Sequence, residues 1–265
     1  MPGQASEFVG DIPAHYDAEL GPNIFEGYAA DMAARAKAFA PTRTLELAAG
    51  TGIVSRKLRD ALIGELVVTD LNAPMLDVAR GKFRADEEVR FEVANAMALP
   101  FPDAAFDLVV CQFGVMFFPD KAASYREALR VLKPGGRYLL SAWGTHAQNP
   151  FAGIAHETVS GFFPDNPPGF YRVPFSYADA GVAIGDLKDA GFTHVTHESG
   201  PRQRQVVDLD AFARGLVYGN PLRDEIKQRG GDADELVEAL ATRFRSAWGA
   251  AQTMPLLATI YCAAR

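Results

Sequence analysis

The chain has 265 residues, of which 48% are hydrophobic and 22% are charged, and its formal net charge is -7. A chain of this length and composition can bury one substantial core with an accessory element, so we expect a globular domain with a lid. Because the net charge is negative, the chain lacks the overall positive charge that supplies most nonspecific affinity for nucleic acid phosphates.

Cysteine usage and the absence of long apolar runs predict the compartment. Cys111 and Cys262 form neither a disulfide framework nor a metal-ligand spacing, which favours a reducing environment and predicts no bound metal. No segment approaches the ~18 apolar residues of a membrane span, and the N-terminus lacks a secretory pattern. We therefore expect a cytoplasmic protein with no membrane span. The oligomeric state is open.

The elements predicted in chain order begin with a leading segment, residues 1–43. Apolar residues at helical spacing over 25–39 predict a helix beside a ligand site or the sheet edge, although core packing alone would give the same spacing.

From 44 to 143, short apolar runs alternate with amphipathic stretches. This pattern is typical of βαβ units in a doubly wound, mostly parallel α/β sheet. The predicted strands are 44–48, 65–69, 89–93, 106–111 and 137–142, and the predicted helices are 54–61, 73–83 and 124–132. Proline and glycine at 134–136 predict a turn after the last of these helices.

The pattern becomes irregular after Trp143, where residues 144–177 are rich in proline, glycine and aromatic side chains. Such a stretch predicts a helical or irregular lid or substrate wall. Residues 178–265 are expected to complete a seven-stranded sheet, with helices at 178–190, 209–218, 223–228 and 234–248 and strands at 194–198 and 256–262.

A run of small residues follows the first predicted strand, reading Leu45-Glu46-Leu47-Ala48-Ala49-Gly50-Thr51-Gly52. Small residues let a ligand approach the backbone, and ligands of doubly wound sheets bind outside the carboxyl ends of the strands. Gly50 and Gly52 are therefore expected beneath a ligand, although a tight strand-to-helix turn would need the same glycines.

An acid, Asp70, ends the second predicted strand. A carboxylate at this position could accept hydrogen bonds from both ribose hydroxyls of an adenosine-containing cofactor. Helix capping is the alternative, with Asn72 as a competing N-cap residue.

The glycine loop also bears on which cofactor is bound. The dinucleotide fingerprint requires a third glycine where this chain has Ser55, and Glu46 places a negative charge near the expected pyrophosphate. S-adenosylmethionine has no phosphate but carries an ammonium and a sulfonium, so it suits an acidic pocket better. A nicotinamide-dependent oxidoreductase is the less favoured alternative.

Several segments in order resemble class I S-adenosylmethionine-dependent methyltransferases. They are the 46–52 loop, the strand end at Asp70, Ala-Asn-Ala-Met-Ala-Leu-Pro-Phe-Pro-Asp at 94–103, Phe-Asp-Leu-Val-Val-Cys-Gln-Phe-Gly at 106–114, and Arg-Val-Leu-Lys-Pro-Gly-Gly-Arg at 130–137. The resemblance covers about residues 44–143 and is nearest to the ubiquinone and menaquinone C-methyltransferases. The C-terminal third matches that group poorly.

This resemblance implies a Rossmann-like fold, S-adenosyl-L-methionine as cofactor and a small-molecule methyl acceptor. By position, residues 50–52 line the methionine part, Asp70 holds the ribose, and Asn95 with Ala96 meets the adenine, on whose face Met75 packs. The implied cofactor-binding residues are Glu46, Ala48, Gly50, Thr51, Gly52, Asp70, Leu71, Met75, Asn95, Ala96, Gln112 and Phe113.

Methyl transfer from a sulfonium needs a general base only if the nucleophile must lose a proton. The candidates are His15, Tyr16, His146, His156 and Tyr171. His146 is favoured, because it follows the fifth strand near the expected pocket mouth and can titrate near neutrality. His194 and His197 are expected to be structural. Tyr16 and Phe25 could shield the cofactor or contact its sulfonium.

The sequence indicates the chemical class of the methyl acceptor but not its identity. The aromatic stretch 162–175 favours a moderately hydrophobic or aromatic small molecule. Asn166-Pro167-Pro168-Gly169-Phe170 resembles the loop of adenine methyltransferases, but it follows the fifth strand and contains an inserted glycine, so no nucleic acid substrate is expected. A non-catalytic S-adenosylmethionine-binding module is the second functional reading. Methylation at carbon, oxygen or nitrogen is equally compatible with the sequence.

Overall fold

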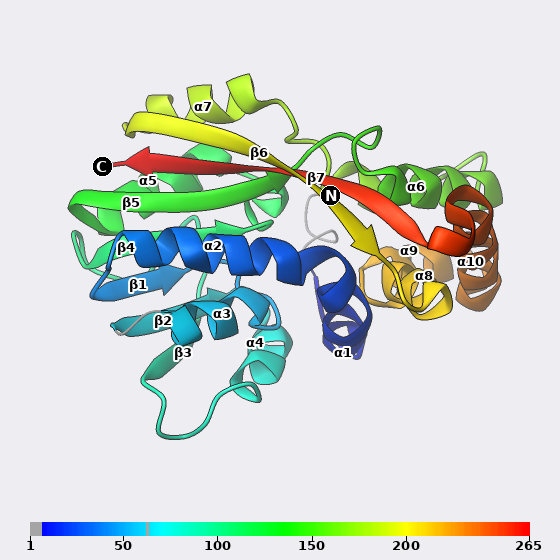
Figure 1. Cartoon of the computed structure of the whole chain (residues 1–265), viewed down its shortest axis with the longest axis horizontal. Coiled ribbons are helices and arrows are strands. Elements are labelled where there is room, and N and C mark those ends of the chain that lie inside the picture. Colours follow the sequence, from blue (N-terminus) through cyan, green and yellow to red (C-terminus); the bar gives the residue numbers. More distant parts are fainter. Residues whose placement is uncertain (1–6, 62–63) are drawn as a thin grey trace.

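A seven-stranded sheet in the order β3-β2-β1-β4-β5-β7-β6 forms the centre of the computed structural model, which describes residues 7–61 and 64–265 (Figure 1). Strands β1 to β5 are parallel, and β7 inserts antiparallel between β5 and β6. This confirms the predicted doubly wound, mostly parallel sheet. The strands are β1 (Arg43–Glu46), β2 (Glu65–Asp70), β3 (Val89–Val93), β4 (Phe106–Gln112), β5 (Leu132–Trp143), β6 (Thr193–Gln205) and β7 (Thr253–Ala264).

Helices cover both faces of the sheet and extend beyond one end of it. In Figure 1, α6, α8, α9 and α10 gather at that end, and α1 lies between them and the sheet. The helices are α1 (Ile12–His15), α2 (Glu26–Ala38), α3 (Ile53–Ala61), α4 (Ala73–Arg80), α5 (Lys121–Val131), α6 (Pro150–Phe162), α7 (Ala180–Asp189), α8 (Leu209–Tyr218), α9 (Leu222–Gln228) and α10 (Ala233–Trp248), with a π-helix (Tyr16–Phe25) and short turns of 3-10 helix at Val115–Phe117, Phe170–Arg172 and Gly249–Ala251. None of these described helices is long and apolar enough to cross a bilayer.

The central strands are buried on both faces. In β4, Leu108 and Val110 pack in the core beneath α2 and α3, whereas Val109 and Cys111 belong to the larger core on the opposite face. A parallel strand covered on both sides reads as a continuous apolar run, which is why β4 was readable from sequence.

The leading helical segment is longer than the predicted 25–39. It runs from Ile12 to Ala38 and includes a ten-residue π-helix, Tyr16–Phe25. Pro22 lies inside the π-helix, where its missing N–H removes one backbone hydrogen bond. A search for the 3.6-residue period does not detect this segment, because its i to i+5 bonding gives a different spacing. Residues 1–6 of the predicted N-terminal segment lie outside the described residues.

The segment 144–177, predicted as a helical or irregular lid, contains one regular helix whose bounds were not predicted. Helix α6 has 13 residues and begins at Pro150, a residue preorganised for the first helical turn. Phe151, Ala155 and Val159 are buried and four residues apart, so a helical signal was present among the glycines.

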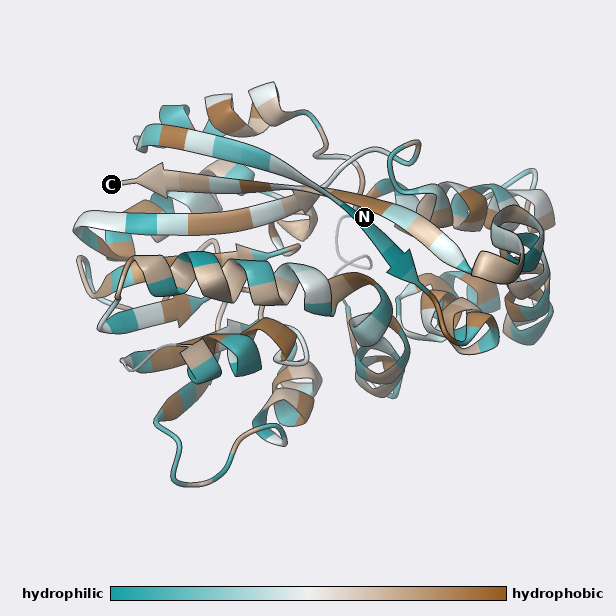
Figure 2. Cartoon of the chain, in the orientation of Figure 1, coloured by the Kyte–Doolittle hydropathy of each residue, from teal (hydrophilic) through white to brown (hydrophobic). Residues whose placement is uncertain are grey.

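The last two strands are also longer than predicted, at 13 residues for β6 and 12 for β7. Strand β6 forms the sheet edge and is mostly exposed. Most of its residues are hydrophilic (Figure 2). Its solvated side chains lack the apolar alternation that marks a half-buried strand. His194 and His197 lie on this edge strand.

Candidate active site

A cavity of about 1190 Å3, including its open mouth, lies at the carboxyl ends of the central strands. The walls come from the leading helical segment, the ends of β1, β2, β4 and β5, the 113–119 loop, the 170–175 loop, α6 and the end of α8. Parallel sheets place ligand sites at this edge.

Two non-glycine residues in this wall have left-handed backbone conformations. Ala48, two residues after β1, has φ 50°, and Phe113, directly after β4, has φ 56°. A Cβ added to Gly114 would lie only 2.5 Å from the Ala48 Cβ, so the two loops are in close contact. Strained backbone of this kind persists where surrounding structure enforces it, and it clusters at functional sites.

The structure brings most of the sequence-predicted residues together. Glu46 and Thr51 line a smaller adjoining space of about 300 Å3, which shares Ala48, Gln112 and Phe113 with the main cavity. The main cavity is lined by Ala48, Gly50, Asp70, Leu71, Met75, Asn95, Ala96, Gln112 and Phe113.

Gly52 lines neither space. A Cβ at Gly52 would lie 2.8 Å from the Ala79 Cβ, so this glycine allows α4 to pack closely against the loop. In contrast, a Cβ at Gly50 would be in ordinary contact with Met75 at 3.6 Å and with Tyr16 at 3.9 Å, inside the cavity.

These positions predict different outcomes for the two glycines. Gly50→Val should weaken S-adenosylhomocysteine binding by tenfold or more, because its side chain occupies the cavity. Both glycines have left-handed backbone, with φ 58° at Gly50 and φ 78° at Gly52, so either substitution costs about 1–2 kcal/mol of stability. Gly52→Ala should mainly lower the melting temperature, because it adds a 2.8 Å contact with the Ala79 Cβ. Calorimetric titration and thermal unfolding of both variants measure this. Normal binding by a folded Gly50→Val protein would show that the loop is misassigned.

Asp70 is held in one orientation at the end of β2. Its Oδ2 accepts the Gly50 N–H at 2.8 Å and its Oδ1 accepts the Asn72 N–H at 2.8 Å. The side chain is 7% exposed, and burial raises the pKa of this carboxyl. Asn72 is the N-cap residue of α4, so Asp70 does not cap that helix. Each carboxylate oxygen keeps acceptor capacity toward the cavity.

Three buried oxygen atoms around the smaller space accept no hydrogen bond among the described residues. They are Glu46 Oε2, Thr51 Oγ1 and Gln112 Oε1. Burial raises the pKa of Glu46 to about 8. Buried polar groups without partners are costly, so a set of unpaired acceptors points to a ligand that donates hydrogen bonds.

Aromatic side chains make up much of the rest of the main cavity. Phe113 stacks on Trp143 with ring centroids 3.9 Å apart, and Tyr16 stacks on Phe25 at 4.8 Å. Sequence reasoning anticipated aromatic lining from 162–175 but missed the contributions of Phe8, Leu20, Ile24, Phe117, Phe118, Phe151, Leu216 and Asn220. Helical periodicity in α6 and α8 could have identified buried faces, but not which buried residues meet a cavity.

None of the five histidines lines the cavity. The His146 ring is hydrogen-bonded through Nε2 to the Tyr171 carbonyl oxygen at 2.9 Å and lies against Phe175. It therefore lies behind the wall rather than at the pocket mouth. His15 pairs with Glu19, and burial lowers the pKa of His156.

Two tyrosines do line the cavity, but neither is prepared to act as a base. Burial raises the pKa of both Tyr16 and Tyr171, and the Tyr171 hydroxyl donates to the Leu216 carbonyl at 2.7 Å.

Comparison with known proteins identifies the family. Residues 45–140 match the model of a methyltransferase domain. The chain is 34% identical over 173 residues to the ubiquinone/menaquinone biosynthesis C-methyltransferase UbiE of Ectopseudomonas mendocina, and the alignment covers 59% of this chain and 67% of that protein. This chain belongs to the S-adenosylmethionine-dependent methyltransferases.

A second curated methyltransferase supports this assignment, and a solved structure shares the fold. The demethylmenaquinone methyltransferase of Deinococcus radiodurans is 38% identical over 158 residues, covering 57% of this chain and 66% of that protein. For other curated relatives the coverage falls to 41% of their length. Haemonchus contortus phosphoethanolamine N-methyltransferase 2, solved with S-adenosyl-L-methionine, shares the fold with a TM-score of 0.60 at 18% identity, covering 96% of this chain and 56% of that one.

The cofactor of this methyltransferase is S-adenosylmethionine, and the cavity fits it. The unpaired acceptors at Glu46, Thr51 and Gln112 suit an ammonium group, and the Asp70 carboxylate suits a pair of hydroxyls. Among the described lining residues no lysine or arginine is available for a pyrophosphate.

Proposed function

We propose that this chain transfers a methyl group from S-adenosylmethionine to a small aromatic acceptor of the quinol type. One observation carries the proposal: a single cavity joins an acidic, glycine-lined end to an aromatic wall. The names of the two curated relatives point to quinone-type acceptors, and an aromatic wall suits a flat apolar ring.

The cofactor-binding roles follow the chemistry of each group. Asp70 would accept hydrogen bonds from the ribose hydroxyls, Glu46 would pair with the ammonium, and Met75 would pack against the adenine. Thr51 and Gln112 would complete the ammonium site. The remaining positions that would contact the cofactor are Ala48, Gly50, Leu71, Asn95, Ala96 and Phe113.

When bound, S-adenosylmethionine supplies a methyl group already activated by its sulfonium. The protein's contribution is then orientation and exclusion of water, which can be worth ~7–11 kcal/mol of the barrier. Asp70 is the only carboxylate among the described residues of the main cavity, and it is committed to backbone N–H groups. A quinol-type acceptor loses one proton when it is methylated, and with no strong base in the described lining of the cavity that proton would be released to water.

His146 has a positioning role in this scheme. Its bond to the Tyr171 carbonyl and its contact with Phe175 would hold the aromatic wall in place. We also propose a cytoplasmic location, because the two cysteines form no disulfide framework. We propose no nucleic acid substrate, because the net charge is -7.

Two measurements test the proposed function. Calorimetric titration should show micromolar binding of S-adenosylhomocysteine and no binding of NADH. Incubation with radiolabelled S-adenosylmethionine should then transfer label to a reduced quinone lacking one ring substituent. Cofactor binding with no transfer to aromatic acceptors would instead support a non-catalytic binding module.

A further inference from the structure

Asn220 is a buried polar residue among the largely aromatic and apolar residues that line the cavity, and the proposed cofactor site gives it no role. It follows α8, lines the main cavity and is only 6% exposed. Resting on the proposed function, we propose that its amide oxygen accepts a hydrogen bond from a hydroxyl of the methyl acceptor and so orients the ring.

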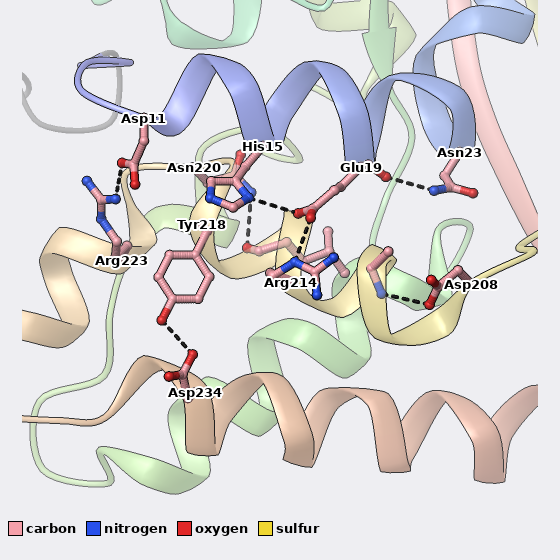
Figure 3. A network of polar contacts seen from close by, with 12 residues as sticks. Asp11, His15, Glu19, Asn23, Asp208, Arg214, Tyr218, Asn220, Arg223 and Asp234 are labelled. Carbon is pink, nitrogen blue, oxygen red and sulfur yellow. Dashed lines mark hydrogen bonds and ion pairs between the residues drawn. The ribbon is translucent and has the colours of Figure 1, made fainter.

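The hydrogen bonds of this amide leave its oxygen available. Asn220 Nδ2 donates to the Leu216 carbonyl at 3.0 Å, the bond drawn beneath His15 in Figure 3. A carbonyl oxygen can only accept a hydrogen bond, so the amide group facing Leu216 must be the NH2. The amide oxygen of Asn220 therefore lies on the other side. The Asn220 side-chain oxygen accepts no hydrogen bond from any described residue.

Asn149 provides an internal contrast. It is fully buried, and its amide uses both ends: Nδ2 donates to the Leu257 carbonyl at 3.0 Å and Oδ1 accepts the Leu257 N–H at 2.9 Å. That arrangement is a complete structural clamp. Asn220 makes the donor hydrogen bond but no matching acceptor bond with the described residues. A purely structural role like that of Asn149 therefore does not explain its amide oxygen.

The position of Asn220 is rigid. Arg214 of α8 pairs with Glu19 of the π-helix at 2.6 Å, and Arg223 of α9 pairs with Asp11, as Figure 3 shows. A Cβ on Gly219 would lie 3.0 Å from the Tyr16 backbone nitrogen, so the end of α8 is packed directly on the π-helix. A polar group fixed in this way is preorganised and can discriminate between ligands.

The chemistry of an amide oxygen defines the ligand class. It accepts a hydrogen bond but takes no proton at neutral pH, so it selects for hydroxyl or N–H donors without acting as a base. Aromatic residues dominate the same cavity. An aromatic alcohol provides both a flat ring for this lining and a hydroxyl that donates to the amide oxygen. Its methyl ether lacks the donor and would leave the amide oxygen unpaired, which lowers affinity.

Naphthol and methoxynaphthalene form a matched pair of probes for this assignment. With S-adenosylhomocysteine present, the wild-type protein should bind naphthol about three- to tenfold more tightly, as expected for one neutral hydrogen bond. Trp143 lines the cavity, so quenching of its fluorescence, checked by calorimetry, reports binding. Asn220→Leu, similar in size, should abolish this preference.

Tyr171→Phe is the control variant. It removes the other hydrogen bond to the Leu216 carbonyl but leaves Asn220 intact, so the preference for naphthol should remain even if both affinities change. Equal wild-type affinity for the two probes, or no naphthol binding, overturns the assignment, as does a preference that survives in Asn220→Leu. Absent S-adenosylhomocysteine binding would instead overturn the proposed function, so the two failures are distinguishable.

Discussion

Replacing Asp70 with alanine is expected to weaken S-adenosylhomocysteine binding by about 1.5–3 kcal/mol, or roughly ten- to a hundredfold. The carboxylate is buried and oriented by the Gly50 and Asn72 N–H groups, so its remaining lone pairs are fixed toward the cavity. Removing it would leave the two ribose hydroxyls without a charged acceptor. Isothermal titration of the variant and the wild-type protein gives the difference directly.

Asp77→Ala serves as a charge-matched control. Asp77 lies on α4, its side chain is 69% exposed, and among the described residues it pairs with Arg80 alone, so its loss should change cofactor affinity little. If folded Asp70→Ala binds as tightly as Asp77→Ala, the ribose assignment is wrong.

Glu46→Gln is expected to remove a pH dependence of cofactor binding. Burial raises the pKa of Glu46 to about 8, so its carboxyl is largely protonated at neutral pH when no cation is beside it. A bound ammonium favours the carboxylate, so wild-type affinity should rise between pH 6 and pH 8, by up to about tenfold per pH unit. Titrations of S-adenosylhomocysteine at both pH values should show this rise in the wild-type protein but not in Glu46→Gln.

Glu46 makes the stability of the cofactor-free protein change with pH in the opposite direction to cofactor affinity. Since the folded pKa of about 8 lies above the ordinary value of 4.5, the folded state binds the proton more tightly than the unfolded state. The stability of the cofactor-free protein should therefore fall as the pH rises from about 4.5 to about 8. A neutral glutamine avoids this loss, so Glu46→Gln should melt at a higher temperature than wild type at pH 8. A lower melting temperature would contradict the burial of an ionisable group here.

The position of Gly50 and Asp70 at the cavity could be predicted because their signals are local. The small residues at 48–52 and the acid at Asp70 follow buried apolar strands, and the fold brings strand ends together at one edge. The sequence could not show that Gly52 lies against Ala79, because glycine permits close approach of either a ligand or a helix.

The rest of the aromatic wall, beyond residues 170–175, could not be predicted, because it is assembled from segments far apart in the chain. Tyr16, Phe151 and Asn220 come from three different helical regions, and their convergence depends on how those helices pack. His146 was predicted near the pocket mouth because it follows the fifth strand. In the structure its ring points toward the Tyr171 backbone, because of how the neighbouring segments pack. Periodicity identifies a buried face, but it does not show whether that face meets another helix or a cavity.

The π-helix has a consequence for how this cavity tolerates insertions and deletions. Tyr16 and Phe25 are nine positions apart and their rings stack at 4.8 Å. Nine residues make about two turns of a π-helix but about two and a half turns of an α-helix, which would place the two rings on opposite sides. The number of residues in this segment therefore matters as much as their identity: one residue more or fewer would exchange an aromatic ring in the wall for a different side chain, with every strand of the sheet unchanged.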